Sequence, residues 1–545
     1  MSLENLPIRD AEPVTDARRR ETKAQGQQPR AGYLDGVDVG GTVGSGIGVR
    51  RETSIGGAQA PAGGSSCEGE AVRVGRGVGV RGSRDDPQKS ISCGERSAGT
   101  WDQAAGRSEG HGDGSQELPT PDKVRKLQTV LYRKAKAEPK YRFWSLYGDI
   151  CREDVLAVAL GRVAANGGAG GVDGVKLADI VAEEGERQQW LRQLRKELVD
   201  KTYRPSPVRR VWIPKADGKQ RPLGIPTVKD RVVQMAAYLV LMPIFEADFH
   251  PDSYGFRPKR SAHQAMKSLC KGLYGGYTEV VDADLSAYFD TIPHRELMRR
   301  VARRVSDGSV LALIRAWLRA PVVEERDGKR RVIPNGKGTP QGGVISPLLA
   351  NLYLNDLDHG VTERARGVAR MIRYADDLVI LCRIGKGKEM RQRLACWLER
   401  RKLSLNEQKT RVVNSPQEGF CFLGFSITWR RSRQGRNYVH VEPSVKSRVQ
   451  LMDRLRRALH MRNTVCDARE KMVEINRLTR GWVNYFRVER GNRVFGQVND
   501  LLHSRVRRWL WWKHRRSRPL YGYYTRSRLQ KQFGLHPIHW QVHAA

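Results

Sequence analysis

The sequence predicts an α+β fold that is followed by a helical, strongly basic region. Short β-rich runs alternate with amphipathic helical segments up to about residue 427, which is the pattern of a mixed fold. The pair Asp217-Gly218 separates two of these runs and indicates a β-hairpin. Residues 444–490 space their apolar side chains as helices do and place arginines between them. These three observations predict the fold class.

The composition indicates a polyanionic partner. The chain has 545 residues, with 97 Lys and Arg against 59 Asp and Glu, which is a formal net charge of +38. Such an excess favours nucleic acid, with an anionic membrane surface as the second option. No stretch approaches the roughly 20 apolar residues that span a bilayer, and the first residues lack the apolar core of a signal peptide. We therefore expect no membrane span and no secretion. A bacterial cytoplasm fits this expectation, and organelles remain open.

Residues 1–120 differ from the rest of the chain. They are rich in Gly, Ser and Arg, poor in Leu, Ile and Phe, and without a sustained helical or strand period. Ordering such a segment would bury too little apolar surface to offset the lost conformational entropy. We expect this low-complexity segment to be disordered. The alternatives are an RNA-binding Arg/Gly arm and translated upstream sequence ahead of a true start near residue 120.

The elements after this segment are predicted in order. Apolar spacing from Pro121 indicates helices, a further helix covers residues 154–165 and ends at the glycines of NGGAGGVDG, and another covers 187–200. The hairpin centred on residues 217–218 comes next, and short strands and helices alternate beyond it. The last fifty residues mix arginines with aromatic residues.

The strongest chemical signal is MIRYADDLVILC, residues 371–382. Two adjacent carboxylates, Asp376 and Asp377, lie between two apolar β-rich runs, which predicts a hairpin with the acids near its turn. Like charges this close disfavour joint ionisation unless a cation neutralises them. Taken alone, the pair has the alternative interpretation of a polar turn that faces solvent.

A second acidic segment favours a metal site. In EVVDADLSAYFDTIPH, residues 279–294, Asp284 follows a β-rich run, although a lone Asp there also suits the N-cap of the next helix. Carboxylate oxygens are the ligands that Mg²⁺ prefers. Two such ions about 4 Å apart can activate a 3′-hydroxyl and stabilise departing pyrophosphate. We expect Asp284, Asp376 and Asp377 to be catalytic and to hold two Mg²⁺, with Asp284 and Asp376 the better candidates for direct ligation.

These motifs resemble the palm motifs of reverse transcriptases. The surrounding blocks have the family's order: IPKADGKQRPLGIPTVKDRVVQ (213–234) resembles the fingers hairpin, and GTPQGGVISPLLANLYLNDLD (338–358) resembles the motif that faces template and nucleotide. SYGFRPKRSAH, LSLNEQKTRVV and FLGF resemble three further blocks. The N-terminal extension and INRLTRGWVNYFR (475–487) resemble those of group II intron-encoded reverse transcriptase/maturases, where the second block is domain X. The resemblance spans about residues 120–490.

The resemblance implies a right-hand polymerase with fingers, palm and a helical thumb. It implies fingers and palm with an N-terminal extension at 121–430, a thumb and maturase domain X at 431–495, and a basic aromatic tail that suits DNA binding at 496–545. The implied function is RNA-directed DNA synthesis that also assists splicing of the host intron RNA and supports mobility by target-primed reverse transcription. The implied partners are intron RNA, an RNA template, a DNA primer or target, and deoxynucleoside triphosphates, in a nucleoid-associated ribonucleoprotein.

Chemistry and resemblance together indicate a nucleotide pocket. A lysine and a forked guanidinium suit a triphosphate, and glycine lets the backbone approach a nucleotide closely. An aromatic ring under the sugar would exclude a 2′-hydroxyl, and a further lysine would assist the leaving group. The structural alternatives are a solvated hairpin face, a core aromatic and a plain surface lysine. The residues expected in this pocket are Lys215, Arg221, Phe289, Gln341, Gly342 and Lys409.

The basic helices are expected to contact nucleic-acid phosphates. Their apolar side would pack on the palm, and their arginines would give an affinity that falls with salt. A solvated amphipathic helix is the alternative. The aromatic residues of RGWVNYF are expected in the core, whereas RRWLWWKHRRSR interleaves arginines with aromatics and favours nucleic-acid contact. The positions expected to bind are 453, Arg456, Arg457, Arg480, Arg507 and Arg508.

The chain departs from the family's pattern in one respect. Many relatives carry a C-terminal nuclease with paired cysteines and histidines, whereas none of the eight cysteines here forms a CxxC pair. We therefore expect no HNH endonuclease, and a primer from another source such as a nascent strand at a replication fork. Two rival functions remain: an RNA-binding maturase without polymerase activity, and a reverse transcriptase recruited to another system such as phage defence.

Overall fold

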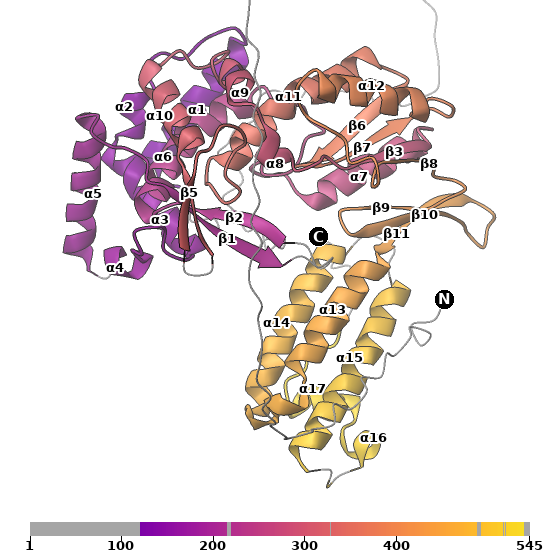
Figure 1. Ribbon diagram of the computed structural model, residues 1–545. Coiled ribbons are helices and arrows are strands. Elements are labelled where there is room, and N and C mark those ends of the chain that lie inside the picture. Colours follow the sequence, from indigo (N-terminus) through magenta and orange to yellow (C-terminus); the bar gives the residue numbers. More distant parts are fainter. Residues whose placement is uncertain are drawn as a thin grey trace, which may run out of the picture. The chain divides into compact units, whose positions relative to one another are not determined.

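The computed structural model describes residues 120–181, 183–214, 220–326, 329–487, 492–515, 517 and 519–538, all within one unit of the chain. The predicted disorder of residues 1–120 therefore concerns, except for Thr120, residues outside the described ones, and the turn predicted at 215–219 also lies outside them. The described residues form helices together with three small sheets (Figure 1), which confirms the expected α+β class.

A group of helices precedes the first sheet. α1 and α3 pack against α6 (Val228–Glu246), most of whose side chains are buried. The predicted helices at 154–165 and 187–200 are α3 and α5. α3 ends at Gly167, whose φ of +61° is a left-handed conformation that glycine adopts without steric cost. The helices of this group are α1 (Asp122–Ala137), α2 (Tyr147–Ile150), α3 (Glu153–Asn166), α4 (Leu177–Val181) and α5 (Glu184–Val199).

The first sheet corresponds to the fingers hairpin and has the strand order β2-β1-β4-β5. β1 and β2 are antiparallel, with Pro214 opposite Gln220, which confirms the predicted hairpin strands. β1 also pairs in parallel with β4, with Val208 opposite Val322. The strands are β1 (Val208–Pro214), β2 (Gln220–Ile225), β4 (Val322–Arg326) and β5 (Lys329–Ile333).

The second sheet corresponds to the palm, and its order is β6-β7-β3-β8. Both of its faces are covered: Val281 belongs to a core that α11 and α12 share, and its neighbour Val280 belongs to a core that α7 shares (Figure 1). The alternation follows from the two-residue period of a strand. The elements are α7 (Ala262–Tyr274), β3 (Glu279–Ala283), α11 (Ser346–Arg364), β6 (Ala369–Tyr374), β7 (Asp377–Cys382), α12 (Gly387–Glu399) and β8 (Arg411–Asn414).

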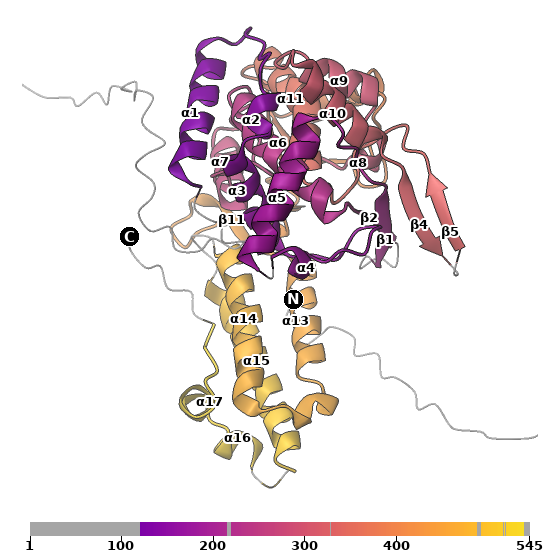
Figure 2. The ribbon, with the colours of Figure 1, turned by 90° about the vertical axis from the view of Figure 1, so that its left-hand side faces the viewer.

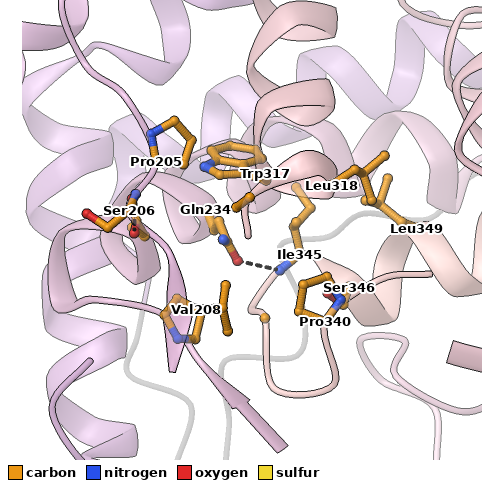
Figure 3. A pocket seen from close by; sticks show the side chains of 14 residues that line it. Pro205, Ser206, Val208, Gln234, Trp317, Leu318, Pro340, Ile345, Ser346 and Leu349 are labelled. Carbon is orange, nitrogen blue, oxygen red and sulfur yellow. Dashed lines mark hydrogen bonds between the residues drawn. The ribbon is translucent and has the colours of Figure 1, made fainter. Parts of the chain in front are cut away.

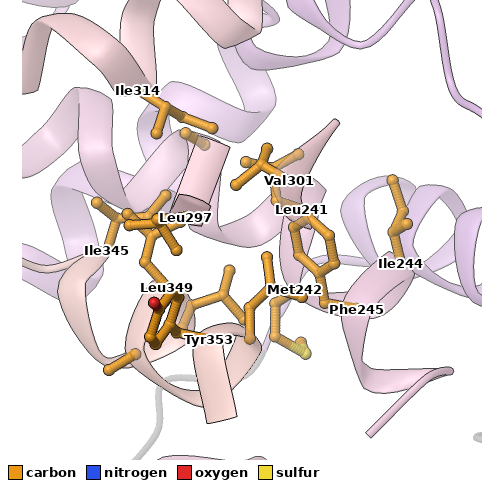
Figure 4. Close-up of a cluster of buried hydrophobic side chains, with 14 of the residues drawn as sticks. Leu241, Met242, Ile244, Phe245, Leu297, Val301, Ile314, Ile345, Leu349 and Tyr353 are labelled. Carbon is orange, nitrogen blue, oxygen red and sulfur yellow. The ribbon is translucent and has the colours of Figure 1, made fainter. Parts of the chain in front are cut away.

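Three helices connect β3 to β4. They are α8 (Tyr288–Thr291), α9 (His294–Val301) and α10 (Gly308–Arg319). Leu297 and Val301 of α9 and Ile314 of α10 pack with α6 and α11 in a continuous apolar core (Figure 4). This core supports the palm from the side of the N-terminal helices.

The C-terminal part contains the third sheet, of order β11-β10-β9, and a set of helices. α13 packs against α14 and α15 (Figures 1 and 2), and α13 and α14 confirm the helices predicted for the basic segment 444–490. α15 runs across residue 496, where the tail is expected to begin. The elements are β9 (Phe420–Phe422), β10 (Phe425–Arg431), β11 (Asn437–Pro443), α13 (Val445–Ala458), the 3₁₀ helix η2 (Met461–Val465), α14 (Ala468–Phe486), α15 (Asn492–Lys513), α16 (Leu520–Tyr523) and α17 (Arg526–Lys531). Among the described helices, none combines the length and apolar character needed to cross a bilayer.

Candidate active site

The acidic motif at 376–377 forms the tight turn between β6 and β7. Tyr374 pairs with Asp377, so Ala375 and Asp376 are the two loop residues. Ala375 adopts φ +59°, a left-handed conformation that is uncommon for a residue with a side chain. The motif is therefore the predicted hairpin, and its acids lie at the end of the palm sheet.

Asp284 reaches the same end of the sheet from the neighbouring strand. β3 and β7 are antiparallel with Ala283 opposite Leu378, so the next pair along the register is Asp284 and Asp377. The N-cap residue of α8 is Ala287, so Asp284 does not cap that helix. The sheet thus brings together two carboxylate segments that are separated by more than ninety residues of sequence.

The electrostatics of this sheet end centre on Asp377. Its pKa is raised to about 6, first because surrounding protein desolvates the carboxylate and second because Asp376, Asp284 and Asp282 add negative charge. Asp377 itself remains open to solvent, so this desolvation comes from atoms around the turn rather than from atoms that cover the carboxylate. A cation at this position would relieve the repulsion.

Two basic or polar side chains already bind the carboxylate of Asp284. Lys409 Nζ lies 3.2 Å from Asp284 Oδ2, and Asn406 Nδ2 donates to the same oxygen at 3.1 Å. Asp282, two residues earlier on the same strand face, pairs with Arg411 at 3.3 Å. Among the described residues, no three His, Cys, Asp or Glu side chains are grouped so that they could already hold a metal ion.

A buried arginine holds the turn from behind. Arg373 is 1% exposed and forms two hydrogen bonds to Asp358, with a third to Asn351 Oδ1 and a fourth to the carbonyl of Ala375 at 2.8 Å. A Cβ placed on Gly255 would lie 2.2 Å from the backbone nitrogen of Ala375. The backbone of the acidic turn is therefore fixed by α11, by β6 and by the loop that carries Gly255.

The residues expected to bind nucleotide lie where the fingers sheet meets the loop before α11. Gln341 accepts a hydrogen bond from Arg221 Nε at 2.9 Å and donates one to Asp290 Oδ2 at 3.0 Å. Gly342 has φ +107°, and a Cβ there would lie 2.3 Å from the carbonyl of Gly224. Two of the expected residues, Arg221 and Gln341, are thus in direct contact.

The other expected nucleotide residues are distributed differently. Phe289 is 8% exposed and stacks edge-on against Phe256, with ring centroids 6.4 Å apart. Lys409 lies at Asp284, as described above. Lys215 lies outside the described residues.

The glycine-rich loop before α11 rests on a small cavity (Figure 3). Pro340, Ile345 and Ser346 line it from one side, and Val208 and Trp317 line it from the other. Gln234 of α6 accepts a hydrogen bond from the backbone nitrogen of Ile345 at 3.5 Å. α6 therefore supports the loop that carries Gln341.

The helical C-terminal part approaches the acidic turn through α14. The pKa of Tyr485 is raised to about 12 because burial disfavours its anion and because Tyr374 and Asp377 are close. Its hydroxyl donates to the carbonyl of Leu423 at 3.1 Å, and its ring stacks on Phe425. Tyr485 and its neighbour Phe486 thus pack on the FLGF turn, as their expected core position requires.

The positions expected to bind nucleic acid differ in their surroundings. Arg456, Arg457, Arg480 and Arg508 are exposed, whereas Arg507 is half-buried and donates to the carbonyl of Tyr524 at 2.8 Å. The expectation for position 453 is wrong because the residue there is Asp453, whose carboxylate pairs with Arg456 at 3.0 Å.

Sequence comparisons identify the chain's relatives. Residues 213–427 match the family described as reverse transcriptase (RNA-dependent DNA polymerase), and residues 449–532 match the group II intron maturase-specific domain. Protein YkfC of Escherichia coli (strain K12) is 36% identical over 367 residues, which is 60% of this chain and 94% of that protein. The group II intron-encoded protein LtrA of Lactococcus lactis subsp. cremoris is 30% identical over 354 residues, 53% of this chain and 57% of LtrA.

The chain belongs to the group II intron reverse transcriptase/maturase family. It therefore carries the functions of an RNA-directed DNA polymerase and of a maturase that assists splicing, and neither rival function is favoured. Within this family, the fingers, palm and helical thumb are the sheets and helices described above. Among solved structures, a chain of a partial Cas6-RT-Cas1–Cas2 complex aligns with 47% of this chain and 40% of its own at 24% identity and a TM-score of 0.30, which is too low to inform function.

Several residues of this reverse transcriptase site were not expected from sequence. Arg505 is half-buried beside Arg456 and Arg508, and its pKa is lowered first by burial and then by those neighbouring charges. Asn406 contacts Asp284, and Arg373 contacts the carbonyl of Ala375, through the fold and not through proximity in sequence. For Arg373, the sequence offered one signal, which is its position as a charged residue inside the apolar run MIRY. A charge that is buried in such a run requires a partner.

Proposed function

We propose that this reverse transcriptase/maturase adds deoxynucleotides to a DNA primer on an RNA template by two-metal nucleotidyl transfer at the end of the palm sheet. The observation that carries the proposal is the concentration of carboxylates there: after desolvation, the charges of Asp376, Asp284 and Asp282 are the causes that raise the pKa of Asp377 to about 6. Asp284 and Asp376 would be the principal ligands and Asp377 an additional one. Bound Mg²⁺ would supply the activation of the 3′-hydroxyl and the charge stabilisation at the leaving pyrophosphate.

The donor chemistry suits magnesium, because all three side chains offer carboxylate oxygens. The site also has to rearrange when ions and nucleotide arrive. Lys409 now occupies Asp284 Oδ2 and would have to release it. Once released, its ammonium group would be free to assist a departing pyrophosphate, which is the role expected from the sequence.

The nucleotide would lie between the fingers sheet and the palm. Arg221 would bind the triphosphate, aided by Lys215, and Gln341 and Gly342 would contact the base pair and backbone. The support is the contact between Arg221 and Gln341, which joins β2 to the loop before α11. Phe289 would contact the sugar and select deoxynucleotides.

The RNA partners would bind the thumb as well as the palm. The exposed arginines of α13, α14 and α15 face solvent without apolar cover, and a phosphate backbone would neutralise them. We propose that host intron RNA binds there for splicing and that the same particle supports target-primed mobility. The bacterial relatives support a setting in a bacterial cytoplasm, in a nucleoid-associated ribonucleoprotein.

A single substitution tests the catalytic proposal. Asp376→Ala should reduce primer extension on an RNA template by at least about 10²-fold, the scale of one lost electrostatic contact to a transition state. Binding of intron RNA should stay nearly unchanged, because Asp376 is not part of the basic thumb surface. Asp200→Ala, an exposed acid at the end of α5, is the matched control. Undiminished synthesis by Asp376→Ala would contradict the metal-site assignment.

A further inference from the structure

A basic pocket lies on α9, α10 and the segment that follows β5. Its volume is about 1010 Å³, and its lining contains none of the residues assigned above to catalysis or nucleotide binding. Six basic side chains line it: Arg295, Arg299, Arg315, Arg319, Lys337 and Lys402. All six are exposed.

The charges of this basic pocket are largely uncompensated. Glu296, the carboxylate in the pocket lining, pairs with Lys402 at 3.4 Å and also lies close enough to Arg299 for an electrostatic interaction. Of the described residues, none supplies a carboxylate in ion-pair contact with any of the other five cations. Arg295 and Arg299 are four residues apart on α9, and Arg315 and Arg319 are four apart on α10. Like charges at this spacing destabilise a helix.

Folding does not account for these arginines. α9 buries Leu297 and Val301, and α10 buries Ile314, in the core shared with α6 and α11 (Figure 4). The arginines lie on the opposite helix faces, where any polar residue would satisfy the amphipathic pattern. Glu296 offsets only part of the positive charge that these side chains concentrate, and a bound anion would offset the rest.

The basic pocket adjoins the polymerase site. Asn335, Gly336 and Lys337 line both the basic pocket and a second pocket of about 580 Å³. The second pocket is walled by β1, β2 and β4 and by the loop that carries Gln341, the partner of Arg221. A ligand that enters the basic pocket and continues past Lys337 therefore reaches the place where template and nucleotide are expected to meet.

We propose that the basic pocket binds the phosphate backbone of the unpaired RNA template ahead of the polymerase site. This rests on the proposed reverse transcription. A single strand can bend from one pocket into the next, whereas a duplex is stiff over such lengths. Arginine forks match phosphate oxygens, and such contacts carry no sequence information, as a polymerase that copies many templates requires.

The test removes one arginine from each helix in the full-length protein. Arg299→Gln/Arg319→Gln is compared with Arg192→Gln/Lys196→Gln, which removes two exposed charges from α5. The probes are a DNA primer annealed to RNA templates with a 5′ overhang of either one or about ten nucleotides. Fluorescence anisotropy gives the Kd at several salt concentrations, and thermal melts confirm that each variant folds.

The wild-type protein should bind the template with the long overhang more tightly than the template with the short one. The variant Arg299→Gln/Arg319→Gln should lose this additional affinity for the long overhang. We expect a loss of several-fold to about tenfold, with the salt slope reduced by about 1.4, the value for two phosphate contacts on a single strand. The short overhang and the α5 control should bind as wild type does.

Three results would overturn the proposal. One is that the pocket variant loses the same affinity for both overhangs, or that the α5 control loses as much affinity as the pocket variant does. Another is a loss confined to folded intron RNA, which would assign the pocket to that RNA. The third is that the pocket variant binds every RNA as wild type does, in which case an acidic protein would be the remaining candidate for the partner of the basic pocket. Addition of one nucleotide by wild type on the short overhang tests the proposed polymerase function separately: its absence would defeat that function, while the overhang comparison would still decide the pocket.

Discussion

At the scale of single residues, the palm sheet places like charges together against their electrostatic preference. Asp377 has its pKa raised to about 6 from an ordinary 3.8, while Lys409 offsets part of the negative charge nearby. The folded protein therefore holds a proton on Asp377 more tightly than the unfolded chain does. Stability linked to this group is fully present below pH 3.8 and is lost as the pH rises from there through about 6.

Asp377→Asn should therefore stabilise the metal-free protein in a pH-dependent way. The melting temperature should rise above that of wild type at pH 7.5 and change little at pH 3.5, which is below the ordinary pKa of 3.8. The gain should be a few degrees at most, because the carboxylate is open to solvent and partly screened. Added Mg²⁺ should raise the melting temperature of wild type more than that of the variant. Equal gains at both pH values, or a similar gain in Asp200→Asn, would contradict this account.

The three acids proposed to be catalytic stand out in the sequence, whereas the side chains that contact them do not. Asp284, Asp376 and Asp377 stand out because each interrupts or ends an apolar run. The contact of Lys409 with Asp284 spans 125 positions and depends on the register of β8 against β3, which no local pattern specifies. The expectation at position 453 failed for a simpler reason, since an acid occurs there among arginines.

At the scale of elements, a buried ion pair lies behind the turn of the β6–β7 hairpin and contacts its backbone. Arg373 and Asp358 are each 1% exposed, and the same guanidinium also holds the carbonyl of Ala375. A buried pair contributes little net stability, but removing one partner leaves a costly unpaired charge. The pair is therefore better explained by the position it imposes on the turn.

Two variants separate these roles. Arg373→Met should destabilise the fold by about 3–5 kcal/mol, the usual cost of leaving a buried charge unpaired. Arg373→Met/Asp358→Leu removes both charges and should recover most of that stability in denaturant titrations. Primer extension should stay low in both, because the Ala375 carbonyl has lost its donor. Recovery of extension in parallel with stability would show that Arg373 does not position the turn.

Local pattern predicted hairpins better than it predicted sheets. The β1–β2 hairpin follows from two β-rich runs around Asp217-Gly218, and the β6–β7 hairpin follows from the runs around the acids. The parallel pairing of Val208 with Val322 joins strands more than a hundred residues apart. Such pairing is set by tertiary packing rather than by propensity.

At the scale of the whole molecule, the C-terminal helices and the palm share one apolar core. Val280 and Ile372 of the palm sheet belong to the same cluster as Phe425, Ile475 of α14 and Trp509 of α15. The aromatic residues of the C-terminal stretch thus have a structural role: Trp509 is fully buried. The arginines that alternate with aromatic residues in this stretch therefore belong to one helix with a buried aromatic face and an exposed basic face.

This shared core predicts the effect of truncation. A chain that ends at residue 495 would lose most of α15, including the buried side chains of Leu502, Val506 and Trp509. We expect α13 and α14 to become sensitive to protease and intron RNA binding to fall sharply, because the remaining helices expose their apolar faces. A chain that ends at residue 538 keeps every described element and should behave as the full chain does. If the 495 chain melted normally, bound intron RNA normally and lost only DNA binding, residues 496–545 would be a separate DNA-binding tail instead.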